Sequence, residues 1–356
     1  MIIKYILNMI VIAELVLKPV PIQYTKEEMQ INNKEQVIHT LTINMKASEI
    51  ELKNSLSFDK VYGFETTSSM SKRFDAIAAV NGIFYDHYGQ HIGGLVTDGE
   101  WLSFSNIITP TVGINEEKDV FIDNIETIEK VKIKEEELYI NGINRVAYYK
   151  EWILYTPEYG NDTRITRHSI NYLIKDNKIK DVVFTNEPVP IINYDYVLSQ
   201  VISGVDMVEE NEKVGKKVSF STKTSPSYNI VEGFQSGGWI VKDGENISKS
   251  KEDFLGYTNY SSPRTLFGVT KDDKVIIKVI DGRQPGYSIG VSGYEAAEIM
   301  LDAGSYNAVY LDGGASSTMV VQNEVINRPS YKGERKVAHS LLFFLNPVKE
   351  ILNELH

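Results

Sequence analysis

The chain of 356 residues has no cysteine. Disulfide bonds, thiolate metal sites and cysteine nucleophiles are therefore excluded. The absence does not assign a compartment, because exported bacterial proteins can also lack cysteine.

Positive charge is scarce as well: 37 Lys and Arg stand against 48 Asp and Glu, which gives a net charge of −11. No cluster of basic residues with interleaved aromatics is present, so nucleic acid is not an expected partner. The chain also lacks a P-loop, and its His-x-x-x-His spacing, from His87 to His91, lies in a Gly-rich stretch rather than in a helix. These features argue against nucleotide kinases and helical zinc sites, and we expect neither a metal nor a cofactor.

Long hydrophobic runs are missing except near the start of the chain, where residues 1–17 are largely apolar. Asn8 and Glu14 interrupt this run, and no small-x-small cleavage site precedes Lys18. Residues 1–23 are therefore interpreted either as an export signal or anchor, or as an amphipathic N-terminal helix. Contact with a membrane is expected only through such an anchor. We expect an extracellular or cell-surface protein, with the cytoplasm as the alternative.

No linker rich in Pro, Ser or Gly divides the remainder. The sequence thus predicts one catalytic domain over residues 24–348, followed by a tail at 349–356. Short apolar runs separated by turn signals fill residues 112–245, a spacing typical of proteins rich in β-strands. The predicted fold is α+β: mostly antiparallel β-sheets with a few packed helices.

Three apolar runs end in a polar residue followed by glycine, at Asn81-Gly82, Asp281-Gly282 and Asp312-Gly313-Gly314. Glycine lets the backbone approach a ligand closely, and a strand end is a rigid platform for a side chain. Any one such junction is usually just a turn. The Asp312 loop differs because Gly313, Gly314, Ala315, Ser316 and Ser317 offer free N–H groups and hydroxyls suited to an anion-binding nest.

The segments on both sides of this loop have clear local signals. Residues 264–270 and 275–281 are two apolar runs joined by a polar turn, which predicts a hairpin. Ser292 followed by Glu295 fits a capping box, and the apolar spacing after it predicts a helix over residues 294–303. Capping accounts for Glu295, so we keep it only as a secondary catalytic candidate.

Arginine is the side chain best suited to hold two oxygens of a phosphate. Arg264, Arg328 and Arg335 lie in the C-terminal third, near the glycine-rich loop in sequence. For any one arginine taken alone, an ion pair without function is the more common role.

Several of these segments together resemble the phosphodiester glycosidase family. The resemblance rests on residues 79–82, 94–100, 154–157, 237–244, 261–270, 279–283, 288–297, 311–319, 326–330 and 334–335. Its most specific part is Leu-Asp-Gly-Gly at 311–314 with the downstream Asn-Arg-Pro and Glu-Arg. Ile83, Ala315 and Trp239 depart from the family pattern, which leaves the identity of the sugar open.

The resemblance implies a hydrolase that releases a sugar, of the N-acetylglucosamine type, from a sugar-1-phosphodiester, by cutting the anomeric C–O bond and leaving a phosphomonoester. A phosphate leaves as a stabilised anion, so charge stabilisation matters more than general-acid help. The substrate expected from this is a small sugar phosphodiester or a phosphoglycan of the cell envelope.

We assign roles on this basis. Asp312 is expected to act as nucleophile, base or stabiliser of an oxocarbenium-like cation, with Asp281 and Glu295 as further catalytic candidates. The expected substrate-binding residues are Asn81, Gly82, Arg264, Gly313, Gly314, Ser316, Ser317, Arg328 and Arg335.

Two other functions fit the same residues. One is a protein that recognises phosphorylated glycans without cutting them. The other is a metal-dependent phosphodiesterase that cuts the P–O bond, with Asp281 and Asp312 as metal ligands.

Overall fold

The computed structural model describes residues 21–104, 109–204, 211–252 and 255–346. Most of the expected N-terminal segment and the whole expected tail at 349–356 lie outside these residues. Within the described part, the chain forms a single domain of mostly antiparallel sheets with two α-helices, as the sequence predicts.

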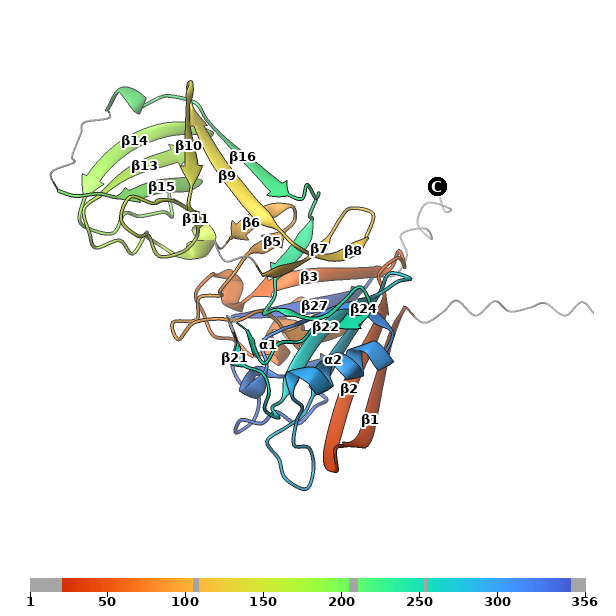
Figure 1. Cartoon of the computed structure of the whole chain (residues 1–356). Coiled ribbons are helices and arrows are strands. Elements are labelled where there is room, and N and C mark those ends of the chain that lie inside the picture. Colours follow the sequence, from red (N-terminus) through yellow and green to blue (C-terminus); the bar gives the residue numbers. More distant parts are fainter. Residues whose placement is uncertain (1–20, 105–108, 205–210, 253–254, 347–356) are drawn as a thin grey trace, which may run out of the picture.

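The largest sheet has seven strands and joins the start of the chain to its C-terminal third. A long N-terminal hairpin pairs with the expected 264–281 hairpin, and the strand that leads to Asp312 follows. In order, the strands are β1 (Ile22–Ile31), β2 (Lys34–Asn44), β23 (Lys274–Ile280), β22 (Arg264–Thr270), β24 (Ser305–Tyr310), β18 (Trp239–Lys242) and β19 (Glu245–Asn246). The expected helix, α2 (Gly293–Asp302), packs on this sheet through Ala296, Ala297 and Met300 (Figure 1).

A second sheet carries the other strands that border the Asp312 loop. Its order is β26 (Glu324–Val325), β25 (Met319–Val321), β4 (Ala78–Asn81), β27 (His339–Leu345) and β3 (Ile50–Leu56). Helix α1 (Thr67–Phe74) covers it, packing its buried Met70 against the strands. Helix α1 is not predicted from the sequence, because six of its eight residues are polar or charged and little apolar periodicity remains.

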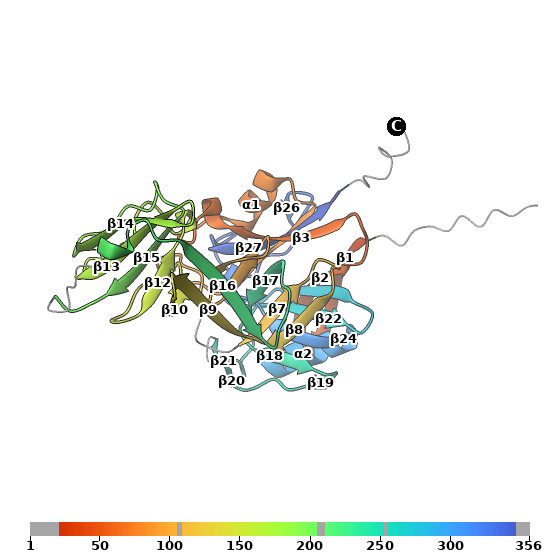
Figure 2. The ribbon, with the colours of Figure 1, turned by 90° about the horizontal axis from the view of Figure 1, so that it is seen from above.

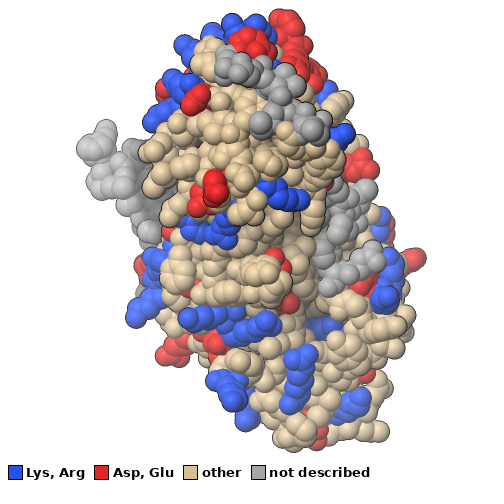
Figure 3. All heavy atoms as spheres, turned by 90° about the vertical axis from the view of Figure 1, so that its left-hand side faces the viewer, with Lys and Arg blue, Asp and Glu red and all other residues tan. Residues whose placement is uncertain are grey.

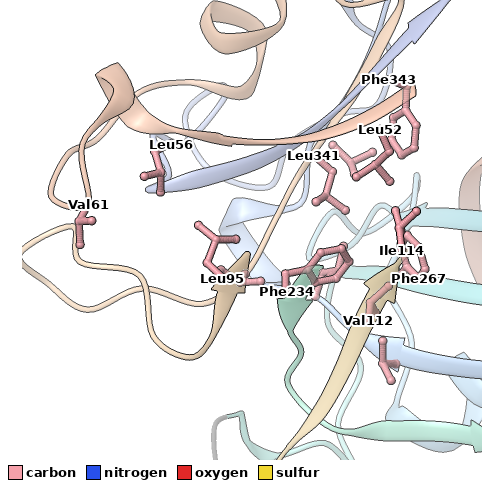
Figure 4. Packing of buried hydrophobic residues seen from close by; sticks show 14 of the residues in the cluster. Leu52, Leu56, Val61, Leu95, Val112, Ile114, Phe234, Phe267, Leu341 and Phe343 are labelled. Atoms are coloured by element: carbon pink, nitrogen blue, oxygen red, sulfur yellow. The ribbon is translucent and has the colours of Figure 1, made fainter. Parts of the chain in front are cut away.

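A third sheet completes the central body. Its strands are, in order, β6 (Glu100–Ser103), β5 (Leu95–Thr97), β17 (Glu232–Gln235), β7 (Pro110–Ile114) and β8 (Val120–Asn124). Side chains from the three sheets meet in one hydrophobic core, where Phe234 and Phe267 pack edge to face with ring centroids 5.5 Å apart (Figure 4). This core fixes the strand ends that carry the polar residues.

The middle of the sequence forms a lobe that projects from this body, as Figures 1 and 2 show. One of its sheets contains β10 (Glu136–Ile140), β9 (Glu126–Ile133) and β16 (Val218–Ser225), and the other β11 (Gly142–Ile143), β12 (Trp152–Tyr155), β15 (Tyr196–Val201), β13 (Ser169–Lys175) and β14 (Lys178–Thr185). The pairing of β11 with β12 is parallel, whereas the other strand pairs of the sheets are antiparallel.

The remaining elements are short. They are β20 (Lys251–Glu252), β21 (Gly256–Tyr257) and the 3-10 helices η1 (Ser57–Asp59), η2 (Pro157–Tyr159), η3 (Asn211–Lys213) and η4 (Gly314–Ser316). The last of these is part of the Asp312 loop.

Candidate active site

Asp312 lies where two sheets meet. Strand β24 of the seven-stranded sheet ends at Tyr310, and the chain continues through buried Leu311 to Asp312. The backbone N–H of Asp312 donates to the carbonyl of Gly82, at 3.0 Å, and its carbonyl accepts from Asn81 Nδ2, at 2.5 Å. The ends of β24 and β4 are thus joined directly, and the two junctions that the sequence singled out at 81–82 and 312–314 are neighbours.

The carboxyl group of Asp312 is partly buried and surrounded by polar groups. Burial raises its pKa to about 6, because a charged carboxylate is poorly solvated there. Hydrogen bonds from the Ser316 hydroxyl and the Gly313 N–H, together with the charge of Arg335, oppose this rise in the pKa. Asp312 is therefore a carboxyl group that changes charge near neutral pH, a property common at catalytic sites.

Tyr85, Ser316 and Arg335 form a connected group beside this carboxyl. The Tyr85 hydroxyl lies 3.4 Å from Ser316 Oγ, and Arg335 Nη1 lies 3.5 Å from the same oxygen. The Arg335 guanidinium is 5.4 Å from the centroid of the Tyr85 ring. Burial raises the pKa of the Tyr85 hydroxyl, and the charge of Asp312 adds to this effect, so the phenol stays protonated. The hydroxyl donates to the backbone carbonyl of Lys336 at 3.1 Å.

A second arginine lies close to the loop. A Cβ atom added to Gly314 would lie 3.2 Å from Arg283 Nη2, so glycine at this position makes room for the guanidinium. Arg283 is exposed and has a φ of 62°, and its Nη2 donates to Ser262 Oγ at 3.1 Å. Arg283 and Arg335 thus both lie close to the loop that carries Asp312, which is a favourable arrangement for a phosphate group.

The loop itself is not the open anion nest that the sequence suggested. The N–H of Gly314 donates to the carbonyl of Pro263, and those of Ser316 and Ser317 donate to Gly313 and Gly314 within the 3-10 turn η4. These donors are already used. Ser317 is buried, and its hydroxyl contacts Thr265 Oγ1 at 3.2 Å. Side chains rather than loop N–H groups are thus the main donors available to an anion.

Asp281 is 1% exposed and has a bracing position. Its oxygens accept from Asn327 Nδ2 at 2.9 Å, from the Arg328 N–H at 2.9 Å and from the Tyr287 hydroxyl at 3.1 Å. Asn327 in turn donates to the carbonyl of Ser317 and accepts from the N–H of Met319. The sequence suggested that Asp281 is catalytic or holds the sugar. In the structure, both of its carboxylate oxygens accept hydrogen bonds from protein groups and hold the 327–328 segment against the Asp312 loop.

Arg264 is also buried, at 4% exposure. Its Nε donates to the carbonyl of Val291, and its Nη2 donates to those of Thr258 and Tyr260, at 3.1 to 3.2 Å. Arg264, the expected phosphate ligand, thus cross-links loops, and these carbonyls take up three of its five N–H donors. Arg328, by contrast, is exposed, with its guanidinium 4.9 Å from the centroid of the Tyr287 ring.

Asn81 and Gly82, which were expected to bind the sugar, also contact protein groups. Asn81 is completely buried, and its Oδ1 accepts from Thr265 Oγ1 at 2.9 Å and from the Thr318 N–H at 3.0 Å. A Cβ atom on Gly82 would lie 1.9 Å from His339 Nδ1, so this glycine is required by packing. Both residues support the Asp312 loop through their contacts with its backbone.

Glu295 caps helix α2. Its Oε2 accepts from the Ser292 N–H at 2.8 Å, and the Ser292 hydroxyl accepts from the Glu295 N–H. Its Oε1 accepts from Asn32 Nδ2 at 2.7 Å. Both carboxylate oxygens thus have structural partners, which favours the capping interpretation over the catalytic one.

Tyr85 and Arg283 are not among the site residues expected from the sequence. Both follow the strand-glycine junctions closely, Tyr85 three residues after Gly82 and Arg283 directly after Gly282. The signal was therefore present, since residues just beyond a strand end share its edge of the sheet.

The described residues contain no group of three or more His, Asp or Glu side chains placed to hold a metal ion. Among the same residues, no helix is both long and apolar enough to cross a membrane.

The region around Asp312 is similar in sequence to known proteins. The sequence model described as phosphodiester glycosidase matches residues 191–344. The SPbeta prophage-derived uncharacterized protein YomE of Bacillus subtilis is 33% identical over 108 residues, and the bovine N-acetylglucosamine-1-phosphodiester alpha-N-acetylglucosaminidase is 28% identical over 103 residues. These matches cover 30% and 26% of this chain but only 16% and 19% of the two relatives.

Solved structures share the fold over most of the chain. A hypothetical protein from Synechocystis superposes with a TM-score of 0.79 at 17% identity, over 92% of this chain and 62% of that one. The catalytic domain of the zebrafish N-acetylglucosamine-1-phosphodiester alpha-N-acetylglucosaminidase superposes with a TM-score of 0.52 at 14% identity, over 92% and 83%. A candidate exported protein of Burkholderia pseudomallei has a TM-score of 0.70 at 20% identity, over 88% and 74%. The segment that matches the phosphodiester glycosidase family, residues 191–344, includes the Asp312 loop, Arg283 and Arg335.

Proposed function

We propose that the protein hydrolyses a sugar-1-phosphodiester at the anomeric C–O bond, releasing the sugar and a phosphomonoester. One observation carries the proposal: a carboxyl group with a pKa of about 6 lies beside the guanidinium of Arg335, within the segment that matches the family. A carboxylate stabilises positive charge and a guanidinium stabilises negative charge, and this reaction develops both.

Each residue near the loop has its own role in the reaction. The C1–O bond breaks, and its electron pair goes to the phosphate oxygen, whose charge Arg335 and Arg283 stabilise. Ionised Asp312 stabilises the oxocarbenium-like carbon or attacks it, or it takes a proton from the water that attacks. The oxygen of that water ends on the sugar. Tyr85 supplies a protonated hydroxyl and an aromatic face at the same place.

The roles of the buried residues follow from their contacts. Asn81 braces the Asp312 loop directly, and Asp281 holds the 327–328 segment beside it, as their hydrogen bonds support. Arg264 joins the loops at 258–260 and 291. The occupied oxygens of Asp281 weigh against a metal-dependent cut with Asp281 and Asp312 as ligands. The charge of Arg335 near the Asp312 carboxyl group favours catalysis over mere glycan recognition.

The substrate proposed is an N-acetylglucosamine-type sugar linked through phosphate, in a cell-envelope phosphoglycan outside the cytoplasm. The names of two relatives support the sugar, since both are N-acetylglucosamine-1-phosphodiester alpha-N-acetylglucosaminidases. The structural neighbour described as a candidate exported protein supports the compartment.

Hydrolysis in ¹⁸O-labelled water tests the proposal. With an alkyl phosphodiester of N-acetylglucosamine, we expect ¹⁸O in the free sugar and none in the phosphomonoester. Asp312→Asn should lower the rate at least about a hundredfold while the fold is kept. Asp273→Asn makes the same chemical change at a half-buried position in the turn between β22 and β23, and it should leave the rate unchanged. Label in the phosphate, or near-normal turnover by Asp312→Asn, would overturn the proposal.

A further inference from the structure

A cavity lies between residues of the lobe and residues of the central body. It has a volume of about 330 Å³ and is lined by Tyr62, Tyr88, Tyr159, Arg164 and Arg167, among others. Pockets that hold small ligands begin at about 300 Å³, so one sugar phosphate would fit. No Asp or Glu belongs to the lining, as far as the structure describes it.

The two arginines are free to bind an anion. Both are exposed, and within the described residues neither guanidinium has a carboxylate partner. The side-chain N–H groups of Arg164 have no hydrogen-bond acceptor in that same part of the chain. Arg167 donates to the carbonyl of Ala147 through Nη2 and keeps its other donors. Two unpaired guanidinium groups in one cavity are unusual in a chain with a net charge of −11.

The aromatic residues hold Arg164 in place. Its guanidinium lies 3.9 Å from the centroid of the Tyr62 ring and 5.5 Å from that of Tyr159. Those rings are packed edge to face, 5.2 Å apart, and the Tyr62 hydroxyl donates to Gln90 Oε1 at 2.7 Å. Stacking on an aromatic face fixes the plane of the guanidinium and leaves its edge, which carries the donors, available. Exposed Tyr88 adds a further ring that can pack on a sugar.

The cavity is close to the Asp312 site. Tyr62 lines the cavity, while Phe64, two residues later, packs against Tyr85 with ring centroids 5.8 Å apart. Two residues of extended chain span about 7 Å. The turn that follows Tyr85 is pinned to the same segment, since the N–H of Gly63 donates to the carbonyl of Gly89 at 3.1 Å.

One face of the molecule carries many basic side chains. On the face drawn in Figure 3, Lys and Arg side chains are spread over the middle and lower part, with Asp and Glu side chains between them, although the chain as a whole is acidic.

We propose that this cavity is an accessory subsite that binds a second phosphorylated sugar of the same substrate chain, with Arg164 and Arg167 on the phosphate and the tyrosines on the sugar. The inference rests on the proposed function for its substrate class. It makes the preferred substrate a polymer with repeated sugar phosphates rather than a single phosphodiester.

Binding of N-acetylglucosamine 6-phosphate to the full chain, measured by calorimetry at low salt, tests the subsite without any turnover. Wild type should bind this probe, and Arg164→Gln/Arg167→Gln should bind it at least about tenfold more weakly. Lys216→Gln/Lys217→Gln removes two charges elsewhere in the lobe and should bind as wild type does. Arg164→Gln alone, which removes no hydrogen bond within the described residues, gives the same test if the double variant folds poorly. Equal binding by the arginine variants, or no binding by wild type, would overturn the subsite.

Turnover separates this inference from the proposed function. The double arginine variant should cleave a single N-acetylglucosamine phosphodiester at the wild-type rate but a polymer of sugar phosphates at least about tenfold more slowly at limiting concentration. Equal rates on the polymer, or equal losses on both substrates, would contradict an accessory subsite. If wild type cleaves neither substrate, the proposed function fails while the binding experiment still decides on the cavity.

Discussion

The side-chain amide of Asn81 donates a 2.5 Å hydrogen bond to the backbone carbonyl of Asp312, across 231 positions of sequence. The same amide accepts from Thr265 and Thr318, so one buried side chain joins the ends of three segments. If Asn81 binds the sugar, its replacement has a different measurable effect than if it only braces the loop. Replacement of a sugar ligand raises KM at normal stability, whereas loss of a brace lowers stability first.

Asn81→Ala is therefore expected to lower the free energy of unfolding by about 3 kcal/mol or more, because several buried groups lose their partner. Urea unfolding at unchanged m-value measures it. Asn161→Ala, at an exposed position, should change the free energy by less than about 0.5 kcal/mol. A stable Asn81→Ala protein with a raised KM would instead restore the sugar-binding interpretation.

Gly82→Ala should destabilise the protein through a steric clash. The added Cβ would lie 1.9 Å from His339 Nδ1, and that ring cannot move freely, since Nδ1 accepts from the Ile83 N–H and Nε2 donates to Asn54 Oδ1. We expect a loss of about 1–3 kcal/mol in the free energy of unfolding. In a double-mutant cycle, His339→Ala should relieve the clash, so that Gly82→Ala costs less in that background. Additive effects of the two changes would show that the ring is not the obstacle.

The parts of the site that sequence predicts are those with local causes. Asp312 follows a short apolar run and precedes two glycines, a pattern that fixes a strand end without knowledge of its neighbours. The 264–280 hairpin and helix α2 are local in the same sense, through a polar turn and a capping box.

The other parts depend on how distant segments cross. Arg264 and Arg335 look alike in sequence, yet one is buried among backbone carbonyls and the other is exposed beside Asp312. Nothing local distinguishes them, because the distinction comes from the loops of residues 258–260 and 291 that fold over Arg264. Helix α1 was missed for the complementary reason: packing by Met70 stabilises a segment whose own residues are mostly polar.

Acid should destabilise the protein through two buried histidines. Burial lowers the pKa of His91 to about 4 and that of His339 to about 3, whereas each has a pKa of about 6.5 when unfolded. Between these values the unfolded chain binds more protons, so the stability is complete above pH 6.5 and falls as the pH drops. The loss is up to about 1.4 kcal/mol per pH unit for each histidine.

Urea unfolding of wild type and His91→Asn between pH 4.5 and 7.5 tests this. The variant should show a shallower decline of the free energy of unfolding with falling pH, whatever its stability at pH 7.5. Asp312 acts in the opposite sense, because its raised pKa makes the folded protein bind more protons between pH 4 and 6. Parallel curves for the two proteins would mean that His91 is not kept neutral by burial.

The pH dependence of catalysis distinguishes the roles open to Asp312. As nucleophile, base or cation stabiliser it must be ionised, so kcat/KM should rise about tenfold per pH unit below pH 6 and level off above it. Arg335 lowers the pKa of this carboxyl, and Arg335→Ala should therefore move the inflection to higher pH. Arg335→Lys, which keeps the charge, should move it less, and Lys332→Ala, an exposed change three residues earlier, should not move it. A rate that falls as the pH rises through 6 would make Asp312 the proton donor to the leaving phosphate. In that case the charge of Arg335 would oppose catalysis by favouring the ionised form, and its removal would extend activity to higher pH.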